Sequence, residues 1–367
     1  MKSRATQVRA LEKSRDTSRQ KWGAASASLG NEVYVQNVVP SPSLMFDYKC
    51  GIGGLPYGHA VEFFGANSLG KSSAIAYPTI ANVQAQGKLP GLILGEPVFD
   101  PDWATKLGVD TELLEIKRPD NADQAFEMLH DMIYENLVDY IVVDSLGSMG
   151  AESEAKEGGK KKAFGISGIV TSGLNAILPR MWKNNQGLLI INQQRQDTKG
   201  KSMPGMTNYE SPGGEGLHHD CVIRIQLKPG RTRYVDKLDG EEILCGRELI
   251  CAFKKNKLAA NSKAARFDFY YQAVEKYDYK LGVDKDEDVL RTGMVSGVIR
   301  GSRARPEHHT FPKGSVHGKP GLAKLLASNP EVYNIIREEI LVKMRAEQAE
   351  AAEPQIPKLK VVPVSND

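Results

Sequence analysis

The sequence predicts an α/β fold with a mostly parallel central sheet. Between about residues 34 and 271, short apolar runs alternate with helical segments such as NADQAFEMLHDMIYENL (121–137). The runs expected as strands are VEFF (61–64), GLILG (91–95), YIVVD (140–144) and GLLIIN (187–192). This order is typical of parallel strands joined by right-handed crossovers, with helices on both faces of the sheet. A glycine-rich stretch directly after the first run also favours this class.

That stretch, GANSLGKSSA (65–74), has the spacing G-x-x-x-x-G-K-S. In such a loop the backbone N–H groups close around an anion, the lysine reaches the outer phosphates, and the serine hydroxyl binds Mg²⁺. The flanks fit, because VEFF is typical of a buried strand and SSAIAYPTIANVQAQG of a helix that stops at Gly87. We therefore expect a nucleotide site, and a coincidental glycine turn is the alternative. Its loop residues are Gly65, Ala66, Asn67, Ser68, Leu69, Gly70, Lys71, Ser72 and Ser73.

A meander is expected after the parallel strands. CVIRIQLK (221–228), ELICAF (248–253) and RFDFYY (266–271) alternate as strands covered on one face do. The alternation places Cys221, Ile223 and Ile225 on one face. We therefore expect Cys221 to be a core thiol and not a metal ligand beside His218 and His219.

The composition describes an ordinary soluble chain. The 367 residues are 41% hydrophobic and 25% charged, which allows two or three domains. No apolar run approaches the ~20 residues of a membrane helix, and the N-terminus lacks the apolar core of a signal peptide. The four cysteines form no C-x-x-C pair and suit a reducing compartment. We therefore expect a cytoplasmic protein without a membrane span, in the host cytoplasm if a phage encodes it.

Four regions follow from the pattern along the chain. Residues 1–40 are expected to form a basic arm for oligomerisation, with seven Lys or Arg in the first 22 residues against Glu12 and Asp16. Whether this arm docks on a neighbour, binds nucleic acid or is simply solvated stays open. Residues 41–280 are the expected ATPase core, and 281–350 a small C-terminal domain with the basic stretch GSRARPEHHTFPKGSVHGKP followed by two helical runs. Residues 351–367 are expected to be a flexible tail.

Polar residues stand at the ends of three predicted strands. Asp144 ends YIVVD at the ligand-binding edge of an open α/β sheet, where it is placed to hold Mg²⁺ through water. A strand-end cap with Ser145 is the alternative. Because a serine and not a glutamate follows Asp144, we expect the water-activating base to be Glu96, at the end of GLILG. Asn192 and Gln193 end GLLIIN, and an amide there can report whether the γ-phosphate is present.

Taken together, these features resemble the RecA-like strand-exchange recombinases, and details resemble their phage (UvsX-like) branch. The stretches that carry the resemblance are CGIGGLPYGHAVEFFGANSLGKSS, GEPVFDPDWATKLGVD, VDYIVVDSLGSM, LLIINQQRQ, SPGGEGL and KKNKLAA, spread over about residues 45–270. The resemblance implies a RecA-type P-loop ATPase core with a mostly parallel sheet, an N-terminal polymerisation arm and a small C-terminal α/β domain.

The resemblance also implies residue roles around ATP and Mg²⁺. Lys71 and Ser72 match the phosphate-loop pair, Asp144 the Mg²⁺-site aspartate, Glu96 the catalytic glutamate and Gln193 the switch glutamine.

Four further residues match positions around the nucleotide base and the subunit boundary. Asp100 matches the residue that contacts the adenine amine, and Trp103 stands where a tyrosine usually packs on the adenine ring. Lys255 and Lys257 match lysines that reach ATP on the adjoining subunit. An ordinary solvated strand end is the alternative for these two lysines.

Two segments resemble the family's DNA-binding loops, at about residues 150–166 and 194–217. Both are long and glycine-rich, which in a compact domain indicates a functional or disordered loop. Basic side chains there can neutralise phosphates, and apolar ones offer surfaces for bases. Two plain surface linkers are the alternative. The residues expected at DNA are Lys160, Lys161, Lys162, Arg195, Lys199, Lys201, Met203, Gly213 and Gly214.

The implied function is ATP-dependent homologous recombination in DNA repair. Protomers would form a helical filament on single-stranded DNA, pair it with homologous double-stranded DNA and hydrolyse ATP in a DNA-stimulated reaction. Single-strand-binding and loader proteins are expected as further partners. His219 departs from the pattern, since it stands where the family has a polymer-contact phenylalanine. A ring helicase or an ATP-dependent regulatory protein on the same core is the alternative, although a helicase should carry an arginine finger in place of the KKNK lysines.

Overall fold

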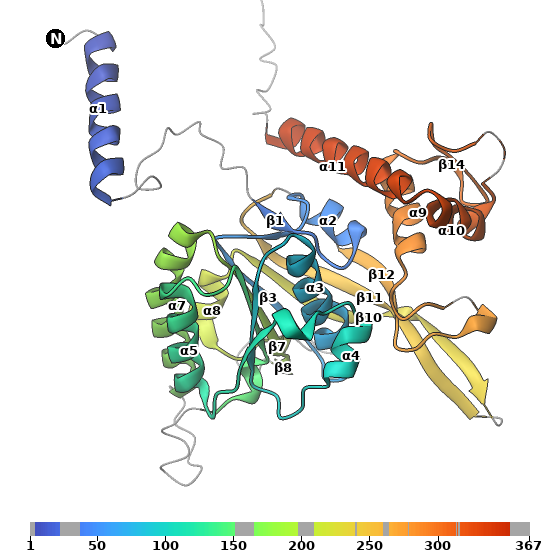
Figure 1. Ribbon diagram of the computed structural model, residues 1–367, viewed down its shortest axis with the longest axis horizontal. Coiled ribbons are helices and arrows are strands. Elements are labelled where there is room, and N and C mark those ends of the chain that lie inside the picture. The colour runs from blue at the N-terminus through green and yellow to red at the C-terminus, as the bar shows by residue number, and fades with distance from the viewer. Residues whose placement is uncertain are drawn as a thin grey trace, which may run out of the picture.

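The structure is a computed structural model that describes residues 4–22, 37–150, 165–196, 209–238, 241–259, 264–277, 279–312, 314 and 316–352 (Figure 1). Its centre is a nine-stranded sheet with the order β13-β12-β11-β10-β3-β7-β6-β4-β5. From β10 to β5 all neighbours pair parallel, whereas β10, β11, β12 and β13 pair antiparallel. The predicted α/β class with a mostly parallel sheet followed by a meander is confirmed.

The strands of this sheet match the predicted apolar runs, with one addition. They are β3 (Ala60–Gly65), β4 (Pro90–Leu94), β5 (Glu115–Lys117), β6 (Tyr140–Asp144), β7 (Gly187–Gln193), β10 (Ile223–Leu238), β11 (Glu241–Asn256), β12 (Ala265–Tyr270) and β13 (Gly282–Val283). The short edge strand β5 has no fully buried residue, so no apolar run announced it. Small two-stranded pairs lie outside the sheet: β1 (Val38–Val39) with β2 (Leu55–Pro56), and β8 (Arg195–Gln196) with β9 (Tyr209–Glu210).

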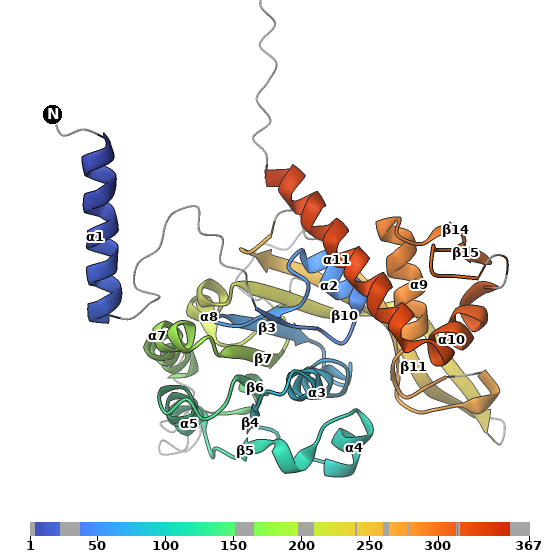
Figure 2. The same ribbon diagram turned by 45° about the horizontal axis from the view of Figure 1, so that its top comes forward.

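Helices cover both faces of the sheet, as Figure 2 shows. On one face lie α2 (Leu44–Cys50) and α3 (Tyr77–Ala85), and on the other α5 (Ala122–Tyr134), α7 (Gly165–Asn184) and α8 (Gly214–Asp220). Successive strand residues point to opposite faces. Along β6, Val142 joins the core under α2 and α3, whereas Ile141 and Val143 join the core under α5 and α7. Strands covered on both faces need continuous apolar runs, which is why the runs were readable.

The prediction for Cys221 is wrong in part. The thiol is fully buried, but the residue ends α8 and β10 begins only at Ile223. Cys221 therefore packs in the core under α5 and α7, while Ile223 and Ile225 pack on the other face. The helix end rotates the chain between the two segments, and an alternation read straight through it assigns the wrong face.

A third core lies in the C-terminal part of the chain. It is built by α9 (Lys285–Ser296), α10 (Gly318–Ser328), α11 (Pro330–Ala352) and the segment after the hairpin of β14 (Arg300–Ser302) and β15 (Arg305–Glu307). Leu44 and Tyr48 of α2 belong to the same core, so the C-terminal elements pack directly on the front of the sheet domain. The domain boundaries themselves stay a prediction. None of the described helices has both the length and the apolar character needed to cross a bilayer.

Asp288 joins α9 to α2 through a buried cap. Its carboxylate accepts hydrogen bonds from Ser43 Oγ at 3.0 Å and from the backbone N–H groups of Leu44 at 2.5 Å and Met45 at 3.3 Å. The first N–H groups of a helix have no partner within it, so this carboxylate completes α2 from a residue far along the chain. Burial raises the pKa of Asp288 to about 7, and these same hydrogen bonds act to lower it.

We expect Asp288→Ala to lower the free energy of unfolding by about 2–3 kcal/mol, because it leaves buried donors unpaired. Denaturant unfolding followed by tryptophan fluorescence and circular dichroism measures the change. Asp286→Ala is the matched control in the same helical turn, where the carboxylate pairs with the exposed Lys280 at 3.2 Å. That substitution should cost under about 1 kcal/mol, and equal losses in the two variants would contradict the capping role.

Candidate nucleotide-binding site

The glycine-rich loop follows β3 and has the backbone geometry of a phosphate loop. Gly70 lies at φ +76° and Ser68 at φ 58°, so the chain turns through the left-handed region twice. Gly65 is required for a different reason, since a Cβ there would lie 2.6 Å from the carbonyl oxygen of Leu227. After Lys71 the chain forms one π-helical turn, η2 (Ser72–Ala76), which continues into α3. The predicted order of strand, loop and helix is confirmed.

Lys71 lies folded over this loop. Its ammonium group donates to the carbonyl oxygens of Gly65 at 3.1 Å and Ala66 at 2.8 Å, and the residue is 9% exposed. Burial lowers the pKa of Lys71, while the charges of Asp144 and Glu96 act to raise it. A buried cation held only by carbonyl dipoles and neighbouring carboxylates favours an anionic ligand nearby. The group therefore fits a nucleotide phosphate.

A cavity of about 470 Å³ opens beside the loop and brings the predicted residues together. Its lining includes Lys71, Ser72, Glu96, Asp144 and Gln193, which come from the loop and from the ends of three strands. Parallel strands all end at one edge of the sheet, so residues far apart in sequence meet there. Oxygen atoms of Ser72 and Asp144 are the ligand type that Mg²⁺ prefers, so the residues fit this ion together with ATP.

Asp144 and Ser72 already interact within this cavity. Asp144 is 2% exposed at the end of β6, and burial raises its pKa to about 6. A hydrogen bond from Ser72 acts to lower that pKa. A carboxylate so poorly solvated gains most from a nearby cation.

Glu96 is held in place by a residue that sequence reasoning passed over. Its Oε1 accepts a hydrogen bond from Ser145 Oγ at 2.7 Å, and Ser145 Oγ lies 3.2 Å from Ser148 Oγ. Because β4 and β6 pair with Leu94 opposite Asp144, the residues just after both strands are neighbours. Ser145 was considered only as a residue that is not the base. The strand pairing could have assigned it to orienting Glu96.

The end of β7 joins the cavity to the second predicted DNA loop. Gln193 lines the cavity and lies opposite Gly65 in the pairing of β3 with β7. Asn192, next to it, donates to the carbonyl oxygen of Pro212 at 2.8 Å, where the chain returns from that loop. Asn192 also donates at 3.1 Å to Glu62, a fully buried carboxylate that pairs with Arg224 at 2.7 Å. Sequence analysis had identified neither Glu62 nor Arg224.

Residues 9–274 match the family model of the RecA N-terminal domain. The chain belongs to the RecA family. Protein RecA of Cutibacterium acnes is 29% identical over 316 residues, which cover 86% of this chain and 85% of that protein. Protein RecA of Arthrobacter sp. strain FB24 is 29% identical over 344 residues, 91% of each chain. Protein RecA of Mycobacterium sp. strain KMS is 29% identical over 331 residues, 90% of each chain.

Members of the RecA family are DNA-dependent ATPases, and this assigns the chain as one. It also supports the predicted use of ATP with Mg²⁺, which the fit of Ser72 and Asp144 accommodates. The relatives are bacterial RecA proteins, so they give no support to the phage branch. Nor do they favour the alternative of a ring helicase or a regulatory ATPase.

Asp100 and Trp103 lie beside the cavity but do not line it. Asp100 caps α4 (Pro101–Lys106) by accepting a hydrogen bond from the backbone N–H of Trp103 at 2.9 Å. The indole N–H of Trp103 donates to Ser73 Oγ at 2.9 Å, next to the phosphate loop. Both contacts are structural, and the adenine-binding roles of these residues stay predictions.

Lys255 and Lys257 lie away from their own cavity. Lys255 Nζ donates to the carbonyl oxygens of His218 and His219, each at 2.7 Å, and Lys257 Nζ donates to that of His219 at 3.4 Å. Both lysines therefore cap the C-terminal end of α8, where cations are favourable. Burial and the charge of Lys257 lower the pKa of Lys255.

Most residues predicted to bind DNA lie outside the described part of the chain: Lys160, Lys161, Lys162, Lys199, Lys201 and Met203. Arg195 is described and exposed, in the short pair of β8 with β9. Gly213 and Gly214 have φ values of +113° and +75° at the start of α8. A Cβ on Gly214 would lie 2.8 Å from Ser167 Oγ, so close packing against α7 already requires this glycine.

We expect Glu96→Gln to lower the ATP hydrolysis rate by about 10²–10⁴-fold, because the substitution keeps the size and removes the base. ATP affinity should stay near wild type, since Lys71 and the loop are unchanged. Steady-state hydrolysis and binding of a fluorescent ATP analogue measure the two quantities. Ser145→Ala is the matched control. It keeps the carboxylate and removes only the hydrogen bond that orients it, so the loss should be smaller. Near-normal turnover in Glu96→Gln would exclude Glu96 as the base.

Proposed function

We propose that this chain is an ATP-dependent homologous DNA recombinase. It assembles as a helical filament on single-stranded DNA, pairs that strand with homologous double-stranded DNA and acts in DNA recombination and repair. The observation that carries the proposal is the junction at the end of β7. Gln193 lines the nucleotide cavity, and Arg195, two residues later, is exposed at the start of the second loop. ATP state and DNA contact thus meet within three residues of one strand end.

In the proposed reaction, Mg²⁺-bound ATP supplies the γ-phosphoryl group that is transferred to water. Lys71 and the loop N–H groups bind the phosphates, and Ser72 with Asp144 holds the ion. Glu96 orients the water and accepts its proton at a carboxylate oxygen, while Ser145 keeps that carboxylate in position. Glu96 sits in the same cavity as Lys71, so binding and proton transfer take place at one site.

We propose that Gln193 transmits the presence of the γ-phosphate to the second loop. Asn192 Oδ1 accepts from the backbone N–H of Gln193 at 3.0 Å, and its amide donates to Pro212 at 2.8 Å. The two ends of the loop are therefore joined through one side chain. The residues between them, with Lys199, Lys201 and Met203, would contact DNA.

We propose that ATP lies between neighbouring subunits. Lys255 and Lys257 would reach the nucleotide of an adjoining subunit, in line with their distance from their own cavity. The N-terminal helix α1 (Arg4–Trp22) would form the polymerisation arm. It stands apart from the rest of the chain in both views (Figures 1 and 2), with Val8 45% and Leu11 63% exposed. Apolar residues on an isolated basic helix favour docking on a neighbour over a purely solvated role.

Several finer expectations belong to the same proposal. Adenine would contact Asp100 and Trp103, the latter being next to the loop through Ser73. Single-strand-binding and loader proteins would be partners, and residues 281–350 would form a small C-terminal domain. The proposal concerns the recombinase class and not the phage branch, which the bacterial relatives do not support.

We expect single-stranded DNA to raise the ATP hydrolysis rate strongly, and DNA affinity to fall steeply with salt as counterions are retained. Arg195→Ala should reduce the slope of log affinity against log salt by about 0.7, the value for one phosphate contact on a single strand. Fluorescence anisotropy over a salt series measures the slope, and Arg195→Lys is the control that keeps the charge. A hydrolysis rate indifferent to DNA would overturn the recombinase proposal.

We expect the double variant Lys255→Ala and Lys257→Ala to lose ATP-dependent filaments while the monomer stays folded, because both side chains lie at the surface end of β11. Electron microscopy with ATP and single-stranded DNA measures assembly. Lys254→Ala is the matched control, since the adjacent residue of a strand points to the opposite face. Normal filaments in the double variant, or equal loss in the control, would contradict the trans role.

A further inference from the structure

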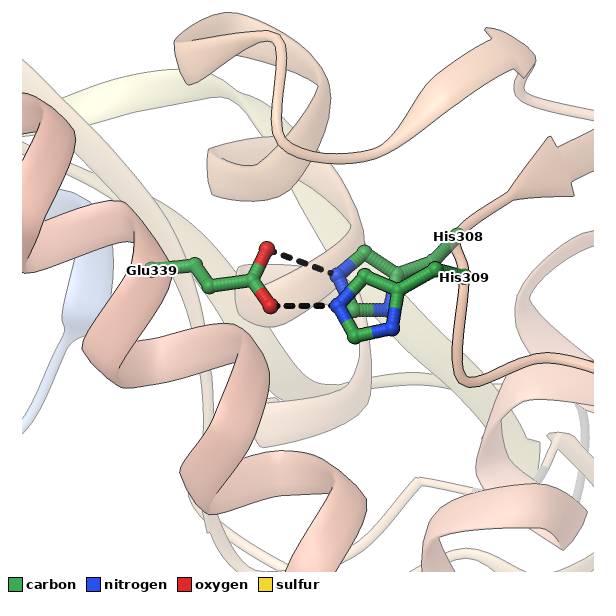
Figure 3. Close-up of side chains that lie close together, drawn as sticks. All are labelled: His308, His309 and Glu339. Atoms are coloured by element: carbon green, nitrogen blue, oxygen red, sulfur yellow. Dashed lines mark hydrogen bonds and ion pairs between the residues drawn. The ribbon is translucent and has the colours of Figure 1, made fainter.

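A group of potential metal ligands lies in the C-terminal part of the chain, away from the nucleotide cavity. His308 and His309 follow β15, and Glu339 projects from α11 toward both rings (Figure 3). His308 Nε2 lies 3.1 Å from Glu339 Oε2, and His309 Nε2 lies 2.5 Å from Glu339 Oε1. Elsewhere in the described ranges, no other three His, Cys, Asp or Glu side chains are arranged to hold a metal ion.

We propose that His308, His309 and Glu339 form a binding site for a divalent transition-metal ion of the zinc type. Two imidazole nitrogens and one carboxylate oxygen are the donor set that zinc accepts with three protein ligands and one open position. The ligand atoms lie within 4.8 Å of one another. Zinc with bonds of about 2.0–2.1 Å holds neighbouring ligand atoms about 3.3 Å apart, so a small inward movement completes the site.

The surroundings of the two rings favour convergence on one ion. The ring centroids lie 4.3 Å apart, with both Nε2 atoms directed at the same carboxylate (Figure 3). The His308 side chain is 1% exposed and packs against Phe311, with ring centroids 5.3 Å apart. This packing fixes one ligand in advance, which lowers the entropy cost of binding. His309 is 66% and Glu339 38% exposed, so an ion can reach the site from solvent.

Thr310 supports either protonation state of the His308 ring. Its hydroxyl lies 2.8 Å from His308 Nδ1 and can donate or accept a hydrogen bond there. When Nε2 carries the proton it donates to Glu339, and the backbone N–H of Thr310 also approaches Nδ1 at 3.3 Å. When Nε2 binds the ion, Nδ1–H donates to the hydroxyl, which is the usual outer contact of a metal-bound histidine.

The carboxylate is suited to the same role. Burial acts to raise the pKa of Glu339, but hydrogen bonds from His309 and His308 outweigh it and the pKa is lowered. Glu339 is therefore ionised at neutral pH and carries the negative charge that offsets part of the ion's charge. A bound ion would join α11 to the segment after β15, across the third core.

The alternative is that Glu339 only forms hydrogen bonds with the two histidines, and zinc titration of the full chain separates the two. The chelator-treated protein is titrated with zinc chloride by calorimetry, without nucleotide or Mg²⁺. We expect His309→Ala and Glu339→Gln each to weaken binding of one zinc ion per chain by at least about tenfold. Zinc should also raise the thermal unfolding midpoint of wild type more than that of either variant.

His130→Ala is the matched control, because His130 lies 3.5 Å from Asp131 on exposed α5 without a third ligand beside it among the described residues. It should bind zinc as wild type does. The exposed position of His309 keeps its variant folded, which the unfolding midpoint without zinc checks. Equal zinc binding by wild type, His309→Ala and Glu339→Gln would overturn the proposal, and so would an equal loss in His130→Ala.

Discussion

The buried carboxylate of Glu62 is the constraint on which the centre of this protein depends. It is fully buried in β3 and is paired on both sides, with Arg224 of β10 at 2.7 Å and Asn192 of β7 at 3.1 Å. A buried charge without partners costs several kcal/mol. A one-residue slip of either neighbouring strand would turn the partner to the other face of the sheet. The register that satisfies Glu62 is the one that sets Gly65 beside Gln193, and so the phosphate loop beside the predicted sensor.

The same carboxylate anchors the chain on its return from the second loop. Arg224, while paired with Glu62, also donates to Ser211 Oγ at 3.0 Å, and Asn192 donates to Pro212 at 2.8 Å. The loop therefore leaves the sheet at Gln193 and comes back to side chains that touch Glu62. A loop fixed at both ends on one rigid group responds to a change at its start by rearranging the residues between, while the sheet stays in place.

The parts of this structure that sequence could predict are those with a local pattern. The glycine spacing around Lys71, the apolar strands and the residues at their ends all follow from short stretches, and parallel pairing brings those ends together. Pairings between distant residues could not be predicted, as Glu62 and Arg224 are 162 positions apart and sit in runs that look apolar or amphipathic. Cys221 was assigned to the wrong face because a helix end interrupts the strand pattern. His308 and Glu339 became neighbours only through the packing of the third core.

The energetics of Lys255 and Lys257 decide whether a role across a subunit boundary is accessible. Lys255 pairs with Arg224, which is level with Glu62 in the first half of β3, whereas the phosphate loop follows the last residue of that strand. In the single chain both ammonium groups bind carbonyl oxygens at the end of α8. A cation at a helix C-terminus is worth about 0.3–1 kcal/mol at an exposed site. A hydrogen bond to a charged group is worth about 1.5–3 kcal/mol, so the phosphates of a neighbour's nucleotide outcompete the helix end. The lysines are thus held near the surface by contacts weak enough to exchange, which links nucleotide binding to assembly.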